Sequence, residues 1–126
     1  MSNDKLQSFS EFWPFYVGEH RLPSNRLLHY VGTLAGLSLW VTALVKLNPW
    51  LALAAALMGY GLAWVGHFVI ERNRPATFTY PLWSFFGDLK MLSFALTGRM
   101  GAEVTRLYSS RRPTRDAPLL SEARAR

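Results

Sequence analysis

The order of apolar and polar positions divides the chain into an apolar middle and two more polar flanks. Residues 30–70 carry a single charged side chain, Lys46. Two apolar stretches in this region, residues 30–45 and 50–70, are separated by the connection KLNPW at 46–50. Stretches of about 16 to 21 apolar residues suit helices that cross a bilayer. The pattern therefore predicts a hairpin of two transmembrane helices.

Glycines in the two apolar stretches indicate that the predicted helices approach each other closely. Gly32 and Gly36 lie four residues apart in the first stretch, a spacing that brings small residues to one face of a helix and allows close contact in lipid. Gly59, Gly61 and Gly66 are expected to line close contacts in the second stretch.

Two shorter segments flank the hairpin and are predicted to be helices that do not span. Residues 8–20 are aromatic and too short to cross a bilayer, with Ser8 or Ser10 as the N-cap and Pro14 near the first turn. A packing helix of a soluble core is the alternative for this segment. Residues 77–97 contain two charged side chains, which favours an amphipathic or re-entrant helix lying over the hairpin as an aromatic lid.

These elements predict an all-α integral membrane protein: a helical bundle of two transmembrane helices with one or two shorter interfacial or re-entrant helices. Residues 1–98 are interpreted as the membrane-embedded domain and residues 99–126 as a basic tail. Seven arginines of the tail contribute to a net charge of +6. They are Arg99, Arg106, Arg111, Arg112, Arg115, Arg124 and Arg126.

The distribution of positive charge predicts the orientation of the hairpin. Basic residues beside apolar spans are typical of a cytoplasmic flank held by anionic lipid, and they favour this interpretation over nucleic-acid binding. The loop at 46–50 has one positive charge, whereas the opposite end of the hairpin has many. Both termini are therefore expected in the cytoplasm, at the inner membrane of a bacterium or the endoplasmic reticulum of a eukaryote.

All three histidines of the chain are predicted to meet at the cytoplasmic end of the hairpin. His29 opens the first span and His67 closes the second, so the topology places both at the same membrane face. His20 lies at the corner before the first span, where Pro23 interrupts the chain and allows it to converge with His29. Glu71 follows His67 by four residues, which places both on one helix face.

Three histidines and a carboxylate indicate a metal site. The chain has no cysteine, so imidazole and carboxylate are the remaining protein ligands. His20, His29, His67 and Glu71 are the candidate metal ligands and catalytic residues, and they suit ferrous iron or zinc. The alternative is that the histidines bind lipid head groups or helix ends, with His67 and Glu71 as a simple helical pair.

A second group of polar residues near these histidines is a candidate for binding substrate. It comprises Asn25, Arg72, Asn73, Arg74 and Asp88. Either arginine suits a carboxylate, and Asn73 with Arg74 suits a carboxylate or a phosphate. The alternative is that these residues only anchor the head-group region, and Asn25 is also a good N-cap for the first span. Asp88 is interpreted either as an acceptor that orients an imidazole or as the partner of an arginine.

A set of short motifs, read in order, resembles a known family. The motifs are Phe15-Tyr16 with His20; Asn25, His29, Gly32 and Thr33; Gly66-His67 with Glu71; and Pro75-Ala76. They are similar to the pattern of the family named for the metabolism of phytosphingosine to odd-numbered fatty acids, in which Asn-x-x-x-His-x-x-Gly is followed by Gly-His-x-x-x-Glu and Pro-Ala. The resemblance covers about residues 12–97.

This resemblance implies a membrane-embedded, iron(II)-dependent dioxygenase that uses O2 to shorten 2-hydroxy fatty acids by one carbon. It implies that His20, His29 and His67 match the family's histidines and that Glu71 matches its acid. The acyl chain is then expected among Trp64, Phe68, Trp83 and Phe86, or in the lipid.

Two other functions remain open at this point. A small membrane scaffold or lipid-binding protein without catalysis would contain no metal. A zinc hydrolase that acts on lipids would differ in metal identity and would not consume oxygen.

Overall fold

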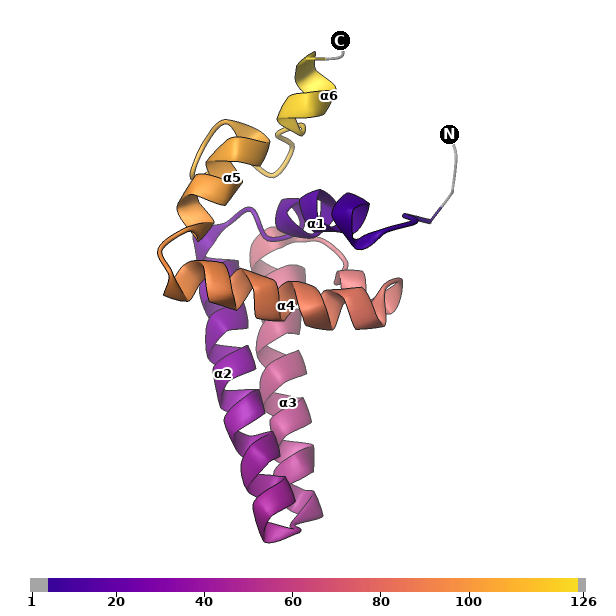
Figure 1. Ribbon diagram of the computed structural model, residues 1–126, viewed down its shortest axis with the longest axis vertical. Coiled ribbons are helices and arrows are strands. Elements are labelled where there is room, and N and C mark those ends of the chain that lie inside the picture. Colours follow the sequence, from indigo (N-terminus) through magenta and orange to yellow (C-terminus); the bar gives the residue numbers. More distant parts are fainter. Residues whose placement is uncertain (1–4, 125–126) are drawn as a thin grey trace.

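A computed structural model describes residues 5–124, which contain helices and no strand. Two long helices form a hairpin, and the shorter helices gather at one end of it (Figure 1). Helix α4 (Pro81–Leu96) crosses the hairpin at this end, and α1 (Phe9–Gly18) lies above α4 in the view of Figure 1, level with the ends of the two long helices. The all-α prediction with two long apolar helices is thus confirmed.

The hairpin consists of α2 (Pro23–Lys46) and α3 (Pro49–Val65), and α3 continues into a π-helical turn, η1 (Gly66–Glu71). Proline is the first residue of both long helices, where its missing N–H costs no hydrogen bond. Leu47 ends α2 in the left-handed conformation, and the Asn48 side chain caps α3 by accepting a bond from the Trp50 N–H. The turn is therefore as tight as the sequence predicts.

Glycines allow the two long helices to touch along their backbones. A Cβ atom on Gly32 would lie 3.3 Å from the Gly59 carbonyl oxygen, and one on Gly36 would lie 3.3 Å from that of Ala55. The expected small-residue contact is confirmed for these positions. It is wrong for Gly61, where an added Cβ would meet no described atom within 4 Å.

A second layer is built from α1, α4 and α5 (Met100–Tyr108). Its buried core combines Phe12, Trp13, Tyr16 and Val17 of α1 with Met91 of α4 and Met100, Val104, Leu107 and Tyr108 of α5. The 3-10 turn η2 (Ala76–Phe78) precedes α4, and α6 (Leu120–Arg124) follows α5. The region beyond residue 98 thus supplies four side chains to this core.

The two long helices have little protein around them. Each is long and apolar enough to cross a membrane, and only 17% of each apolar window is buried inside the molecule. Large side chains along them are exposed, including Val45 at 78% and Leu57 at 66%. A core helix of a water-soluble protein would be mostly buried, so the hairpin is suited to a lipid environment.

Two local predictions about helix ends are corrected by the structure. Asn25 is not the N-cap of α2, because the helix begins at Pro23 and Leu22 is the cap residue. Pro14 lies inside α1 and not in its first turn. The cap of α1 is Ser8, whose hydroxyl accepts a bond from the Glu11 N–H.

Candidate metal centre

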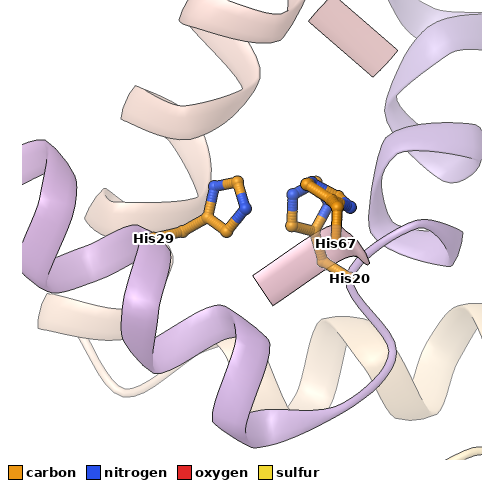
Figure 2. A group of neighbouring side chains, drawn as sticks. All are labelled: His20, His29 and His67. Atoms are coloured by element: carbon orange, nitrogen blue, oxygen red, sulfur yellow. The ribbon is translucent and has the colours of Figure 1, made fainter. Parts of the chain in front are cut away.

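The three histidines meet at the end of the hairpin that α1 and α4 cover. His20 lies in the turn after α1, His29 in the second turn of α2 and His67 in η1. Their ring centroids are 4.3 to 4.9 Å apart, and the rings stand nearly perpendicular to one another. One ligand nitrogen from each ring lies within 4.8 Å of the other two. Figure 2 shows the His29 ring on one side of the cluster and the His20 and His67 rings on the other.

The Nδ1 atom of each imidazole ring makes a hydrogen bond to an oxygen atom of the protein. The His20 Nδ1–H donates to the Tyr16 carbonyl oxygen at 2.6 Å, and the His29 Nδ1–H donates to Asp88 Oδ1 at 3.3 Å. The His67 Nδ1–H donates to Asn73 Oδ1 at 2.7 Å. Since each acceptor fixes the proton on Nδ1, the Nε2 lone pairs remain free to bind a metal.

Burial of the three rings keeps their free nitrogens out of water. His20, His29 and His67 are 1%, 5% and 2% exposed. The Nε2 atoms of His20 and His29 are buried and have no hydrogen-bond partner among the described residues. Burial, together with His29 and His67 close by, lowers the pKa of His20 well below its usual range. His20 is therefore neutral, which is the form that binds a metal.

The π-helical turn at the end of α3 positions His67. Arg72 ends η1 in the left-handed conformation with φ 59°, and the Asn73 N–H then donates back to the His67 carbonyl oxygen at 2.9 Å. The Asn73 amide also donates to the Glu19 carbonyl oxygen at 3.0 Å and to the Glu19 carboxylate. These two donations orient the Asn73 oxygen toward His67. Asn73, predicted to bind substrate, connects η1 to the turn that carries His20.

Glu71 and Asn25 form a clamp beside the three histidines. Glu71 Oε1 accepts the Leu22 N–H at 2.6 Å and the Asn25 amide at 3.4 Å. The Asn25 Oδ1 atom contacts the backbone of Gly66, since a Cβ atom there would lie 1.8 Å from it. The structure groups the three imidazoles as possible metal ligands and does not bring Glu71 into that group. The clamp joins the start of α2 to the end of α3.

Asp88 and Tyr16 lie at the edge of the histidine cluster. The Tyr16 hydroxyl donates to Asp88 Oδ1, the same oxygen atom that accepts from His29. Among the described residues Asp88 makes no ion pair with an arginine, so the structure favours the interpretation of Asp88 as the acceptor that orients an imidazole. Burial and the neighbouring Asp88 raise the pKa of Tyr16 well above its usual range.

The two arginines predicted to hold a substrate carboxylate point elsewhere. Arg72 and Arg74 are both exposed, and the Arg74 guanidinium lies 5.1 Å from the centre of the Phe78 ring. Neither residue lines the cavity at the histidines. The sequence contains no signal for Ser84, a cavity-lining serine that is 5% exposed.

A cavity of about 330 Å³ begins at the histidines and continues between α2 and α3. Its polar end has the three histidines, Tyr16, Ser84 and Asp88. Its apolar end reaches Trp40 of α2 and Ala52 of α3. His29 and Trp40 are eleven residues apart, which is about 16 Å along a helix. We call this space the interhelical groove.

The groove is lined by only one of the four aromatic side chains that the sequence places around an acyl chain. Trp64 lines it, but Phe68, Trp83 and Phe86 do not. Tyr60 and Phe85 line it instead and are 55% and 48% exposed, so one side of the groove is open.

The fold and site define a helical protein with two potential membrane spans and a buried three-histidine centre at the head of an apolar groove. Within that class the chain belongs to the family described as 2-hydroxy-palmitic acid dioxygenase Mpo1-like, whose family model matches residues 6–100. No curated protein and no solved structure matches the chain. The match includes all three histidines and helices α1 to α4, and it confirms the family resemblance.

Proposed function

We propose that this protein is a membrane dioxygenase that uses iron(II) and O2 to convert 2-hydroxy fatty acids into acids one carbon shorter. The observation that carries the proposal is the position of three imidazoles that could hold a metal ion, at the polar end of an apolar groove. A 2-hydroxy fatty acid has the matching shape, with a compact polar head and a long apolar tail. The family description supports both the substrate class and the reaction class.

The donor set fits a catalytic metal ion. Three imidazole ligands would leave coordination positions free for substrate oxygens, as catalytic sites require. Two of the Nε2 atoms are buried without a partner in the described part of the chain, which costs stability unless a ligand satisfies them. Iron is favoured over zinc because zinc has no redox chemistry. Iron bound by His20, His29 and His67 would supply the activation of dioxygen.

The proposed reaction balances without any further reductant. The bond between C1 and C2 of the 2-hydroxy acid breaks, C1 leaves as carbon dioxide and C2 becomes the new carboxyl carbon. This oxidation releases four electrons. Reduction of one O2 takes up four electrons, so the products are the shortened acid, carbon dioxide and water.

The residues around the site would orient the substrate and exclude water. The Tyr16 carbonyl, Asp88 and Asn73 hold the three imidazoles in place. Helices α1 and α4 cover the polar end, so the 2-hydroxy acid head would be shielded from bulk solvent. The acyl tail would lie in the interhelical groove, toward Trp40 and Ala52. Because the groove is apolar and partly open, lipid tails and substrate tails would share this environment.

The membrane arrangement follows from the same geometry. Helices α2 and α3 would cross the bilayer, which satisfies their exposed apolar side chains. The three-histidine end would lie at the cytoplasmic interface, because the arginines cluster there. A substrate would then keep its head at the interface and its tail in the hydrocarbon layer.

Metal analysis and oxygen uptake test the proposal together. Protein purified anaerobically in detergent is analysed for metal, reconstituted with ferrous iron and supplied with 2-hydroxypalmitate. We expect about one iron per chain, oxygen consumption and a fifteen-carbon acid. His67→Ala should lose iron and turnover, whereas Ser93→Ala, on α4 outside the groove, should keep both.

Other outcomes would assign a different function. Stoichiometric zinc with no oxygen uptake would indicate a hydrolase. No metal in either protein after reconstitution would overturn the enzyme assignment and favour a membrane scaffold or lipid-binding protein.

A further inference from the structure

Helix α4 brings two polar side chains into the groove, and only one of them has a partner. Ser84 and Asp88 lie four residues apart and therefore share a face of the helix. Asp88 accepts bonds from Tyr16 and His29. Ser84 is 5% exposed, and its hydroxyl has no hydrogen-bond partner among the described residues.

An unused serine hydroxyl inside a helix is unusual, because it can normally return to a backbone carbonyl. Ser38, Thr42 and Thr105 each donate to the carbonyl four residues earlier, at 2.8 Å. Ser84 lies in the same kind of helix, but its hydroxyl makes no such bond. A buried hydroxyl without a partner destabilises a fold, so its position beside a substrate cavity indicates a ligand contact.

The proposed substrate has an oxygen atom that needs a donor. A 2-hydroxy acid can bind a metal through its hydroxyl and one carboxylate oxygen, which leaves the second carboxylate oxygen in a mostly apolar cavity. Asp88 is an acceptor, the Tyr16 hydroxyl already donates to Asp88, and the imidazoles would hold the metal. Thr33 also lines the cavity, but it is only half-buried.

We propose that Ser84 is a substrate-binding residue whose hydroxyl donates a hydrogen bond to the carboxylate of the 2-hydroxy acid. This inference rests on the proposed function, since it requires that the acid head lies at the three-histidine centre. In this proposal Ser84 contacts the carboxylate, and the exposed Arg72 and Arg74 do not.

Equilibrium binding without oxygen separates the contact from catalysis. Iron-loaded wild type, Ser84→Ala and Ser93→Ala are titrated anaerobically with 2-hydroxypalmitate and with 1,2-hexadecanediol, which keeps the tail and the 2-hydroxyl but lacks the carboxylate. We expect Ser84→Ala to weaken binding of the acid about 10- to 100-fold, which is typical for a hydrogen bond to a charged group. The diol should bind all three proteins alike.

The stability of Ser84→Ala is a second readout. Alanine is the better helix former, and the substitution removes a buried polar atom without a partner. The melting temperature without substrate should therefore stay the same or rise, while affinity for the acid falls. A serine with a purely structural role would show the opposite change. If Ser84→Ala does not fold, Ser84→Cys keeps the size, offers a weaker donor and is expected to show a smaller loss for the acid alone.

Several results would overturn the inference. They are unchanged binding of the acid by Ser84→Ala, equal losses for acid and diol, or a loss that appears in Thr33→Val and not in Ser84→Ala. A wild-type protein that binds neither compound would also overturn it. Selective loss of acid binding in a protein that does not consume oxygen would support the Ser84 contact and exclude the dioxygenase, so the two failures are distinguishable.

Discussion

Each histidine of the centre depends on a neighbouring oxygen atom, and these oxygens come from different parts of the chain. His20 is held by the carbonyl of a residue one turn earlier, whereas His29 and His67 are held by side chains of Asp88 and Asn73. The sequence indicates the imidazoles because histidine is rare and suited to metals. It does not assign Asn73 to His67, because that contact depends on the π-helical turn and on the left-handed Arg72.

Asn73 should affect metal affinity without touching the metal. Replacement by alanine removes the acceptor that fixes the His67 ring and its protonated nitrogen. We expect Asn73→Ala to bind ferrous iron about 10- to 100-fold more weakly, as is usual for such supporting contacts. Anaerobic metal titration measures the change, with Arg74→Ala as the exposed control on the same loop. Equal affinities in Asn73→Ala and wild type would show that the ring is held by packing alone.

Gly66 should be far less tolerant of a side chain than Gly61, although both lie near the end of α3. A Cβ atom on Gly66 would collide with the Asn25 side chain, whereas Gly61 has open space. We expect Gly66→Ala to cost about 1–3 kcal/mol. Gly61→Ala should be neutral or stabilising, because alanine favours a helix. Thermal unfolding in detergent compares the two, and equal melting temperatures would contradict the contact between Asn25 and Gly66.

At the level of helices, the sequence predicts elements well where length and apolar content decide the outcome. The tight turn at Asn48 and Pro49, the glycine contact at Gly32 and Gly36, and the convergence of the histidines are all confirmed. The groove is not predicted, because it depends on which small residues of α2 and α3 face the same side. The sequence also does not predict which side of α4 faces the three histidines, since that helix has apolar residues on most of its surface.

The length of the groove should set the preferred length of the acyl chain. Ala56 lines its apolar part, eleven residues before His67. A phenylalanine there would block the far end, so Ala56→Phe should retain turnover of short 2-hydroxy acids and lose it for long ones. Leu57→Phe is the matched control, because Leu57 lies outside the groove and is 66% exposed. Chain-length profiles of kcat/KM that coincide for both variants would exclude the groove as the tail site.

At the level of the whole molecule, the two layers have different surroundings. The hairpin buries little of itself, whereas α1, α4 and α5 share a compact core above it. The sequence separates residues 99–126 as a basic tail, but α5 contributes Val104 and Tyr108 to that core. The sequence does not predict this contact, because the segment is rich in arginine and the apolar face of α5 is short. That face is recognised only when the residues of α5 are placed on a helix that packs against α1.

The predicted orientation can be tested with single cysteines, because the chain has none of its own. Lys46→Cys marks the turn of the hairpin and Ser110→Cys, just after α5, marks the opposite end, and both positions are exposed. In intact cells a membrane-impermeant maleimide should label Lys46→Cys, while Ser110→Cys should react only after lysis. The reverse result would invert the hairpin and place the histidines on the outer face.

The open side of the interhelical groove has a kinetic consequence. A substrate tail would enter sideways from the bilayer, so the relevant concentration is the mole fraction of 2-hydroxy acid among the surrounding lipids. Diluting vesicles with buffer would leave the rate per protein unchanged. Adding inert phospholipid at constant total substrate would slow it in proportion. The turnover rate would thus depend on the lipid composition of the bilayer and not on the concentration of substrate in the bulk water.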